Sequence, residues 1–418
     1  MATYELVKAK AQAAKQAAAK LAVTSTAVKN AALLAMAAAL EAQQSEILAA
    51  NERDMTAAAA KGMKSSMLDR LKLTAERISG MADGLRQVAG LADPVGNVID
   101  GKTLPNGLHI TKIRVPLGVI GIIYEARPNV TADAAALCLK SGNAVILRGG
   151  KEAIHSNIAI SDIMREAVKS VGLDENVIQL VHDTSRESST ELMRMKGTLD
   201  CLIPRGSKRL IQAVVENASV PVIETGSGNC HIYVDESADI NMAANIIFNA
   251  KTQRIGVCNA CESLVIHENI IKKALPAIKA RLDEKNVELR GCERTREILG
   301  DSVIPAIEVD WATEYLDYIL AVKVVDNIDE AIAHITKYSS GHSECIVTEN
   351  YKNANRFKNE VDAAAVYVNA STRFTDGGMF GLGAEIGIST QKIHARGPMG
   401  LNELTSMKFI IEGDGQIR

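Results

Sequence analysis

The feature that most limits the fold of this chain is an alternation of short Val-, Ile- and Leu-rich runs with helical stretches of ten or more residues. In its first round we expect strands at 119–124, 143–147, 176–181, 201–204 and 220–224, and helices at 131–140, 153–171, 187–195 and 208–217. Strands buried on both faces have this composition, and helices connect neighbouring parallel strands. The pattern therefore predicts a doubly wound parallel α/β sheet.

A second round of the same pattern begins near residue 225, with strands expected at 263–267, 321–325, 345–348 and 365–369. Residues 1–90 are expected to be helical, because they are rich in Ala, Leu, Glu and Gln. The Asn106-Gly107 pair between two extended runs predicts a hairpin over 97–116. We therefore expect two α/β domains and a small β hairpin.

Composition argues against several classes of partner. The 418 residues carry a formal net charge of -3, so there is no global basic field to hold a nucleic acid, and only 3% are aromatic, which disfavours base stacking. No apolar run approaches the roughly 20 residues that a membrane span needs. The seven cysteines are odd in number and scattered, and no secretory signal is visible. We expect a cytoplasmic protein that uses neither nucleic acid nor membrane.

Three loops follow expected strands, at the sheet edge where α/β proteins bind ligands. Arg148-Gly149-Gly150-Lys151 and Arg205-Gly206-Ser207 each lead into a helix, so free N–H groups and cations could hold phosphates. A Gly-containing turn without such a role is the alternative for both. The third loop, Glu224-Thr225-Gly226, could carry a general base or simply a solvated carboxylate.

Cys258 stands out among the cysteines because it lies in a loop, Gln253 to Cys261, near Arg254. Cations and backbone amides lower the pKa of a thiol and make it a nucleophile. A buried structural cysteine and a redox or zinc pair with Cys261 are the alternatives. No second pair of ligands stands at short spacing, so we expect no metal site.

These pieces together resemble the aldehyde dehydrogenase superfamily, and within it the branch that reduces gamma-glutamyl phosphate in proline biosynthesis. The resemblance runs essentially end to end and is most specific at 124–131, 144–153, 257–260, 325–346 and 368–378. It implies two Rossmann-like α/β domains plus a β oligomerisation flap. The NADP(H)-binding domain would comprise 1–96 and 117–224, the catalytic domain 225–400, and the flap 97–116 and 401–418.

The resemblance implies that Cys258 attacks L-glutamate 5-phosphate, that phosphate leaves, and that NADPH reduces the resulting thioester. Glu224 resembles the general base of the superfamily, although an activated acyl phosphate has less need of one. Ala126 stands where the usual Asn oxyanion donor is expected, so Asn129 is the substitute candidate. Arg127 and Arg373 are the candidates for holding the phosphate or α-carboxylate of the substrate.

For the cofactor, the resemblance implies contacts from Arg148, Gly149, Gly150, Lys151, Arg205, Gly206, Ser207, Gly226 and Glu314. A cation at Lys151 suits a 2′-phosphate and hence NADPH, Gly206 and Ser207 would meet the pyrophosphate, and Glu314 the nicotinamide ribose. Met379 stands where Glu is expected, so the role of that loop stays open. The resemblance implies a homo-oligomer, dimer or tetramer, and allows for glutamate 5-kinase as a partner.

Two other functions stay open at this point. The chain could be a different aldehyde dehydrogenase, acylating or hydrolytic, that acts on another small aldehyde. It could also be a nucleotide-binding protein that kept the fold without the enzyme activity.

Overall fold

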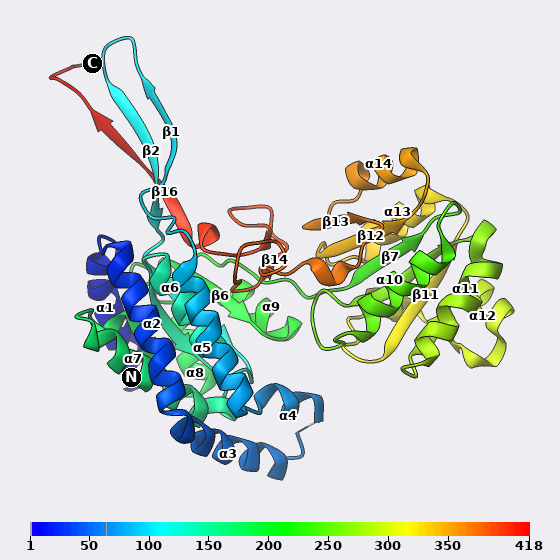
Figure 1. Cartoon of the computed structure of the whole chain (residues 1–418), viewed down its shortest axis with the longest axis horizontal. Helices are drawn as coiled ribbons and strands as arrows, with labels where there is room; N and C mark the ends of the chain where they lie inside the picture. The colour runs from blue at the N-terminus through cyan, green and yellow to red at the C-terminus, as the bar shows by residue number, and fades with distance from the viewer. Residues whose placement is uncertain (1, 64) are drawn as a thin grey trace. The chain divides into compact units, whose positions relative to one another are not determined.

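The computed structural model describes residues 2–63 and 65–418 and forms two compact units (Figure 1). The first unit comprises Met1–Thr225, Gly381–Gly387 and Met399–Arg418, and the second Gly226–Phe380 and Ile388–Pro398. The expected catalytic domain ran from 225 to 400. The structure differs in that Thr225, Gly381–Gly387 and residues 399–400 belong to the first unit.

The first unit is built on a four-stranded parallel sheet in the order β5-β4-β3-β6. The strands are β3 (Val119–Tyr124), β4 (Ala144–Arg148), β5 (Ile178–Leu180) and β6 (Cys201–Arg205). The helices that follow them are α6 (Asn129–Lys140), α7 (Ile154–Ser170), α8 (Arg186–Met193) and α9 (Lys208–Asn217), with 3₁₀ turns at Lys151–Ala153 and Glu175–Val177. β3 and β4 are buried along their whole length, which explains their aliphatic composition.

The expected N-terminal helices are present as α1 (Ala2–Leu21), α2 (Thr26–Ala42), α3 (Gln44–Ala60), α4 (Ser65–Leu71) and α5 (Ala75–Gly90). α2 packs against both α5 and α7, and its buried side chains include Ala32, Met36 and Leu40. Among the described residues, no helix combines the length and the apolar character needed to cross a bilayer.

The hairpin prediction is confirmed. β1 (Val98–Thr103) and β2 (His109–Pro116) are antiparallel, and β16 (Thr405–Glu412) adds to β2 to give the order β1-β2-β16. Gly107 has a φ of 89°, the left-handed conformation that the turn requires. Figure 1 shows this sheet extending away from the helices of the first unit. We call these three strands the flap.

The second unit contains a seven-stranded sheet in the order β10-β9-β11-β8-β7-β12-β13, whose neighbours are all parallel. The strands are β7 (Cys230–Val234), β8 (Cys261–His267), β9 (Glu288–Gly291), β10 (Ile304–Pro305), β11 (Ile319–Val325), β12 (Ser343–Val347) and β13 (Ala365–Val368). The helices are α10 (Ile240–Thr252), α11 (Glu268–Asp283), α12 (Glu293–Leu299), α13 (Ile328–Tyr338) and α14 (Tyr351–Glu360), and β14 (Ile388–Ser389) pairs with β15 (Gly397–Pro398). Two parallel α/β sheets confirm the expected fold class.

One strand prediction is wrong and five strands were missed. Residues 220–224 form a single bridge to β6, between Val222 and Leu202, because Pro221 has no N–H to extend the ladder. The strands β7, β9, β10, β14 and β15 were not expected. β7 is fully buried, but its sequence Cys-His-Ile-Tyr-Val carries polar groups that obscure the strand signal.

Candidate active site

Cys258 lies in the connection between α10 and β8, in a turn closed by the Ala260 N–H donating to the Val257 carbonyl at 3.2 Å. It is half-buried and takes part in no disulfide. The Cys230 thiol donates to the Cys258 carbonyl at 3.2 Å and fixes the turn from the side of β7. The sequence therefore places this thiol on a rigid turn that still reaches solvent.

A glycine turn, Gly226 to Asn229, packs directly on the backbone of Cys258. A Cβ on Gly228 would lie 1.4 Å from the Cys258 carbonyl oxygen, so no other residue fits there. The Gly228 N–H donates to Glu314 Oε1 at 2.8 Å, and the Gly226 N–H donates to the Ile388 carbonyl at 2.8 Å. Two predicted site residues, Gly226 and Glu314, are thus brought to the turn that carries Cys258.

Arg373 approaches the same turn from the 3₁₀ segment Thr372–Phe374. Its guanidinium donates to Asn259 Oδ1 and, through Nε, to Gln253 Oε1 at 3.1 Å. Burial lowers the pKa of Arg373, and Arg254 acts in the same direction, while the Cys258 sulfur and Asp376 oppose them. The charge of Arg373 and a negative charge on the Cys258 sulfur therefore attract each other.

The two cysteines nearest in sequence and structure are poor nucleophiles. Burial raises the pKa of the Cys261 thiol, and burial together with the Glu344 carboxylate raises the pKa of Cys230 well above its usual value. Cys261 lies on β8, fully buried, with its sulfur near the Ser263 carbonyl at 3.4 Å. Of these three neighbouring thiols, Cys258 is the one that is only half-buried.

A buried ion pair that the sequence analysis missed supports the loop that carries Glu314. Lys251 Nζ lies 2.5 Å from Glu262 Oε2, with both side chains fully buried. Glu262 Oε1 accepts the N–H of Leu316, whose φ of 54° is unusual for a residue with a side chain. Burial raises the pKa of Glu262 to about 7 against the attraction of Lys251. The sequence signal for this buried pair was a lone Glu directly before the expected strand at 263–267.

The first unit holds the remaining predicted residues at the carboxyl ends of its strands. Arg148 is buried, and its guanidinium donates to the carbonyls of Gly149 and Ser185 at 3.1 and 2.7 Å, so it joins β4 to the start of α8. A Cβ on Gly149 would lie 2.1 Å from Asn157 Nδ2, and one on Gly150 would lie 2.4 Å from Glu152 Oε2. The Gly149-Gly150 turn is therefore tightly packed.

The neighbouring loops place the other candidates of the first unit. Ser207 caps α9, with Gly206 and Arg205 just before it. Asn129 begins α6, is exposed, and donates to Asp133 Oδ2 at 2.9 Å. Burial raises the pKa of Asp133 to about 6, although the hydrogen bond from Asn129 and the charge of Arg205 act to lower it. Arg127 and Glu224 are half-buried in the same unit. The sequence analysis missed Asp133. Its position four residues after Asn129 on an expected helix was the available signal, because residues at this spacing lie side by side.

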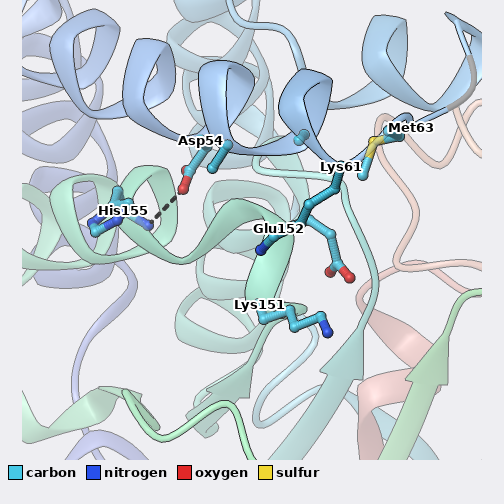
Figure 2. Close-up of a pocket in the computed structure, with 8 residues that line it drawn as sticks. Asp54, Lys61, Met63, Lys151, Glu152 and His155 are labelled. Carbon is cyan, nitrogen blue, oxygen red and sulfur yellow. Dashed lines mark hydrogen bonds between the residues drawn. The ribbon is translucent and has the colours of Figure 1, made fainter.

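Lys151 borders a pocket of about 350 Å³ between the end of α3 and the start of α7 (Figure 2). The pocket is lined by Asp54, Ala57, Ala58, Lys61, Met63, Lys151, Glu152 and His155. Asp54 is already engaged, because its carboxylate accepts the N–H groups of His155 and Ser156 at 3.2 and 2.8 Å. Lys61, which the sequence analysis did not single out, adds a second ammonium group to the lining.

Comparison with known proteins agrees with this architecture. The model of the aldehyde dehydrogenase family matches residues 1–295 and 311–410. The chain is 60% identical over 412 residues to the gamma-glutamyl phosphate reductase of Caldanaerobacter subterraneus subsp. tengcongensis, which covers 99% of each chain. It is 60% identical over 418 residues to that of Heliobacterium modesticaldum, with 100% of each chain covered.

Among solved structures, the gamma-glutamyl phosphate reductase of Thermotoga maritima superposes with a TM-score of 0.95 at 53% identity, covering 99% of each chain. The relatives and the solved structure match 99% or more of the chain, and the family model matches most of it. The chain therefore belongs to the aldehyde dehydrogenase family and, within it, to the gamma-glutamyl phosphate reductases, which are oxidoreductases.

Proposed function

We propose that this enzyme reduces L-glutamate 5-phosphate to L-glutamate 5-semialdehyde with NADPH, through a thioester on Cys258. The observation that carries the proposal is the setting of Cys258. The thiol is half-exposed on a turn that Gly228 contacts closely, and the charge of Arg373 attracts a negative charge on its sulfur. This is what a covalent mechanism needs, and the relatives are named for the same substrate.

The residues of the chain account for the chemistry as follows. The Cys258 thiolate attacks the acyl carbon, a C–S bond forms, and the C–O bond to phosphate breaks as phosphate leaves. When bound, NADPH supplies the hydride that reduces the thioester carbon. The C–S bond then breaks, the aldehyde forms, and Cys258 returns as a thiolate.

We assign the substrate anions to Arg127 and Arg373, because a guanidinium fork binds a phosphate or carboxylate in two places. Arg373 has donors to spare beyond its bonds to Asn259 and Gln253. Asn129 is assigned to the oxyanion, with one amide hydrogen used by Asp133. Glu224 has a minor role, since phosphate is a good leaving group and no water has to be activated.

The structure offers groups that fit the parts of NADPH. The N-terminus of α9, with Gly206 and Ser207, suits a pyrophosphate, and Lys151 with Lys61 beside the same pocket suits a 2′-phosphate. The ends of strands β4 and β6 next to these groups carry the other assigned residues, Arg148, Gly149, Gly150 and Arg205. Gly226 and Glu314 belong to the turn at Cys258, where Glu314 suits the nicotinamide ribose.

The test is an assay in the oxidative direction with L-glutamate 5-semialdehyde and NADP⁺. We expect NADPH formation that requires inorganic phosphate, and no turnover by Cys258→Ala. Cys261→Ala, which changes a buried thiol three residues away, is the matched control and should stay active. Phosphate-independent oxidation would instead indicate a hydrolytic aldehyde dehydrogenase, and substantial turnover by Cys258→Ala would rule out the thioester.

The cofactor preference has its own test. Lys151→Glu should raise the KM for NADPH by about tenfold while changing the KM for NADH less, because a carboxylate repels a 2′-phosphate and accepts ribose hydroxyls. Lys169→Glu makes the same charge change at the exposed end of α7 and is the control. An equal change in both KM values would contradict the assignment of Lys151.

We further infer a cytoplasmic homo-oligomer. The substrate is an acyl phosphate, which hydrolyses readily in water, so direct transfer from glutamate 5-kinase would protect it.

A further inference from the structure

The carboxylate of Glu125 occupies the N-terminus of α9. β3 and β6 are neighbours, with Tyr124 opposite Arg205, so the loops that follow them meet. Glu125 Oε2 accepts the N–H of Ser207 at 2.8 Å, and Glu125 Oε1 accepts the Ser207 hydroxyl at 2.8 Å. The Glu125 N–H donates to the Arg205 carbonyl at 3.1 Å. Glu125 is thus held through both its backbone and its carboxylate.

Gly206 makes room for this carboxylate. A Cβ at Gly206 would lie 2.7 Å from both Cδ and Oε2 of Glu125. The absence of a side chain therefore lets an anion lie over the turn and reach the free N–H groups of the helix. In the structure, the anion at this position is the carboxylate of Glu125.

This arrangement conflicts with simultaneous cofactor binding. Gly206 and Ser207 are the groups proposed above for the pyrophosphate, and Glu125 takes the N–H and hydroxyl donors of Ser207. Two anions about 4 Å apart repel each other by about 1 kcal/mol in water and by more near a protein surface. A pyrophosphate bound there would therefore compete with the Glu125 carboxylate for the same donors of Ser207.

We propose that Glu125 is a displaceable latch: it fills the pyrophosphate site of the free enzyme and leaves when NADPH binds. This inference rests on the proposed function. The segment that moves is short and carries other candidates, because Arg127 donates its N–H to the Glu125 carbonyl at 2.6 Å and α6 begins at Asn129. Displacement of the latch links cofactor binding to the residues assigned to the substrate.

The latch has a measurable consequence. A closed latch lowers the apparent affinity by the fraction of enzyme that is open, so its removal tightens binding. We expect Glu125→Ala to bind NADPH about fivefold more tightly than the wild type, and Glu125→Gln to lie between them. The amide of Glu125→Gln keeps an oxygen acceptor for the Ser207 N–H, which guards against loss of the α9 cap.

The experiment is a fluorescence titration of each purified full-length protein with NADPH, next to a thermal unfolding curve. Glu216→Ala removes an exposed carboxylate at the other end of α9 and should leave the dissociation constant unchanged. Unchanged or weaker NADPH binding by both Glu125 variants would overturn the latch alone. A wild-type enzyme that binds no NADPH would overturn the proposed function together with the latch.

Discussion

At the scale of single residues, Gly228 has the strictest requirement in the second unit. Any Cβ there would lie 1.4 Å from the carbonyl oxygen of Cys258. Because this oxygen belongs to the backbone, it cannot move aside as a flexible side chain could. We expect Gly228→Ala to displace the turn of Cys258 and to lower kcat by at least about tenfold, since small shifts of a nucleophile cost large factors in rate.

The matched control for Gly228→Ala is Gly84→Ala, in the middle of α5, where a new Cβ meets nothing within 4 Å. That change should leave kcat unaltered and stabilise the helix by about 0.5–1 kcal/mol. Steady-state kinetics and thermal unfolding measure both. Activity of Gly228→Ala within twofold of wild type would show that the Cys258 turn is not rigid.

His334 makes stability depend on pH. Burial, followed by His231 and Lys323, lowers its pKa from 6.5 to about 3. As the pH falls from 6.5 toward 3, the unfolded chain binds a proton that the folded chain does not, so stability falls by up to about 1.4 kcal/mol per pH unit. We expect His334→Gln to show a shallower loss over that range.

The fluorescence of Trp311, the single tryptophan, is a suitable probe for this prediction because its ring lies 5.5 Å from that of His334. Urea unfolding at several pH values gives the slope. His155→Gln, which changes an exposed histidine of α7, should keep the wild-type slope. Equal slopes for wild type and His334→Gln would contradict the prediction.

At the scale of elements, α7 depends on a cap supplied by another helix. Ala153, at its N-cap, has no side-chain acceptor, and Asp54 of α3 accepts the N–H groups of His155 and Ser156 and the Ser156 hydroxyl. Asp54→Ala should destabilise the protein by about 1–3 kcal/mol, because it leaves buried donors unpaired.

The comparison for Asp54→Ala is Glu52→Ala, which removes an exposed carboxylate from the same helix and should change stability by less than about 0.5 kcal/mol. Differential scanning calorimetry separates the two. Similar melting temperatures for both variants would mean that water satisfies these N–H groups as well as Asp54 does.

Elements with a clear period were predictable, and contacts between them were not. β3 and α9 were expected with the bounds that the structure shows, because an apolar run and an amphipathic stretch are local signals. The pairing of Glu125 with Ser207 depends on β3 lying beside β6, and the chain alone does not reveal that order. Cys258 was recognised from its loop, whereas the Lys251–Glu262 pair needed the fold to bring the two side chains together.

At the scale of the whole molecule, a net charge of -3 is compatible with the anionic substrate and cofactor proposed above because the cations are local. Lys61 and Lys151 border one pocket, and Arg373 lies at the Cys258 turn. Binding of these anions should therefore weaken with salt mainly through these few groups and not through a long-range field.

The flap carries the prediction for assembly. β16 is an edge strand of the order β1-β2-β16, and Met407, Phe409 and Ile411 alternate along it with exposed fractions of 53%, 61% and 60%. Exposed apolar edge strands pair with another chain or aggregate, so we expect this strand to be covered in a homo-oligomer. The double change Phe409→Asp and Ile411→Asp should give a monomer, because two carboxylates cannot be buried in such an interface without partners.

Size-exclusion chromatography with light scattering gives the mass of each species. Thr103→Asp adds a carboxylate to β1, at the far edge of the same sheet, and should leave the mass of the wild-type oligomer unchanged. A double variant that keeps the wild-type mass would show that β16 is not the interface. A wild type that is already monomeric would show that the flap has another use, and the apolar row on β16 would then have to be explained by a different partner.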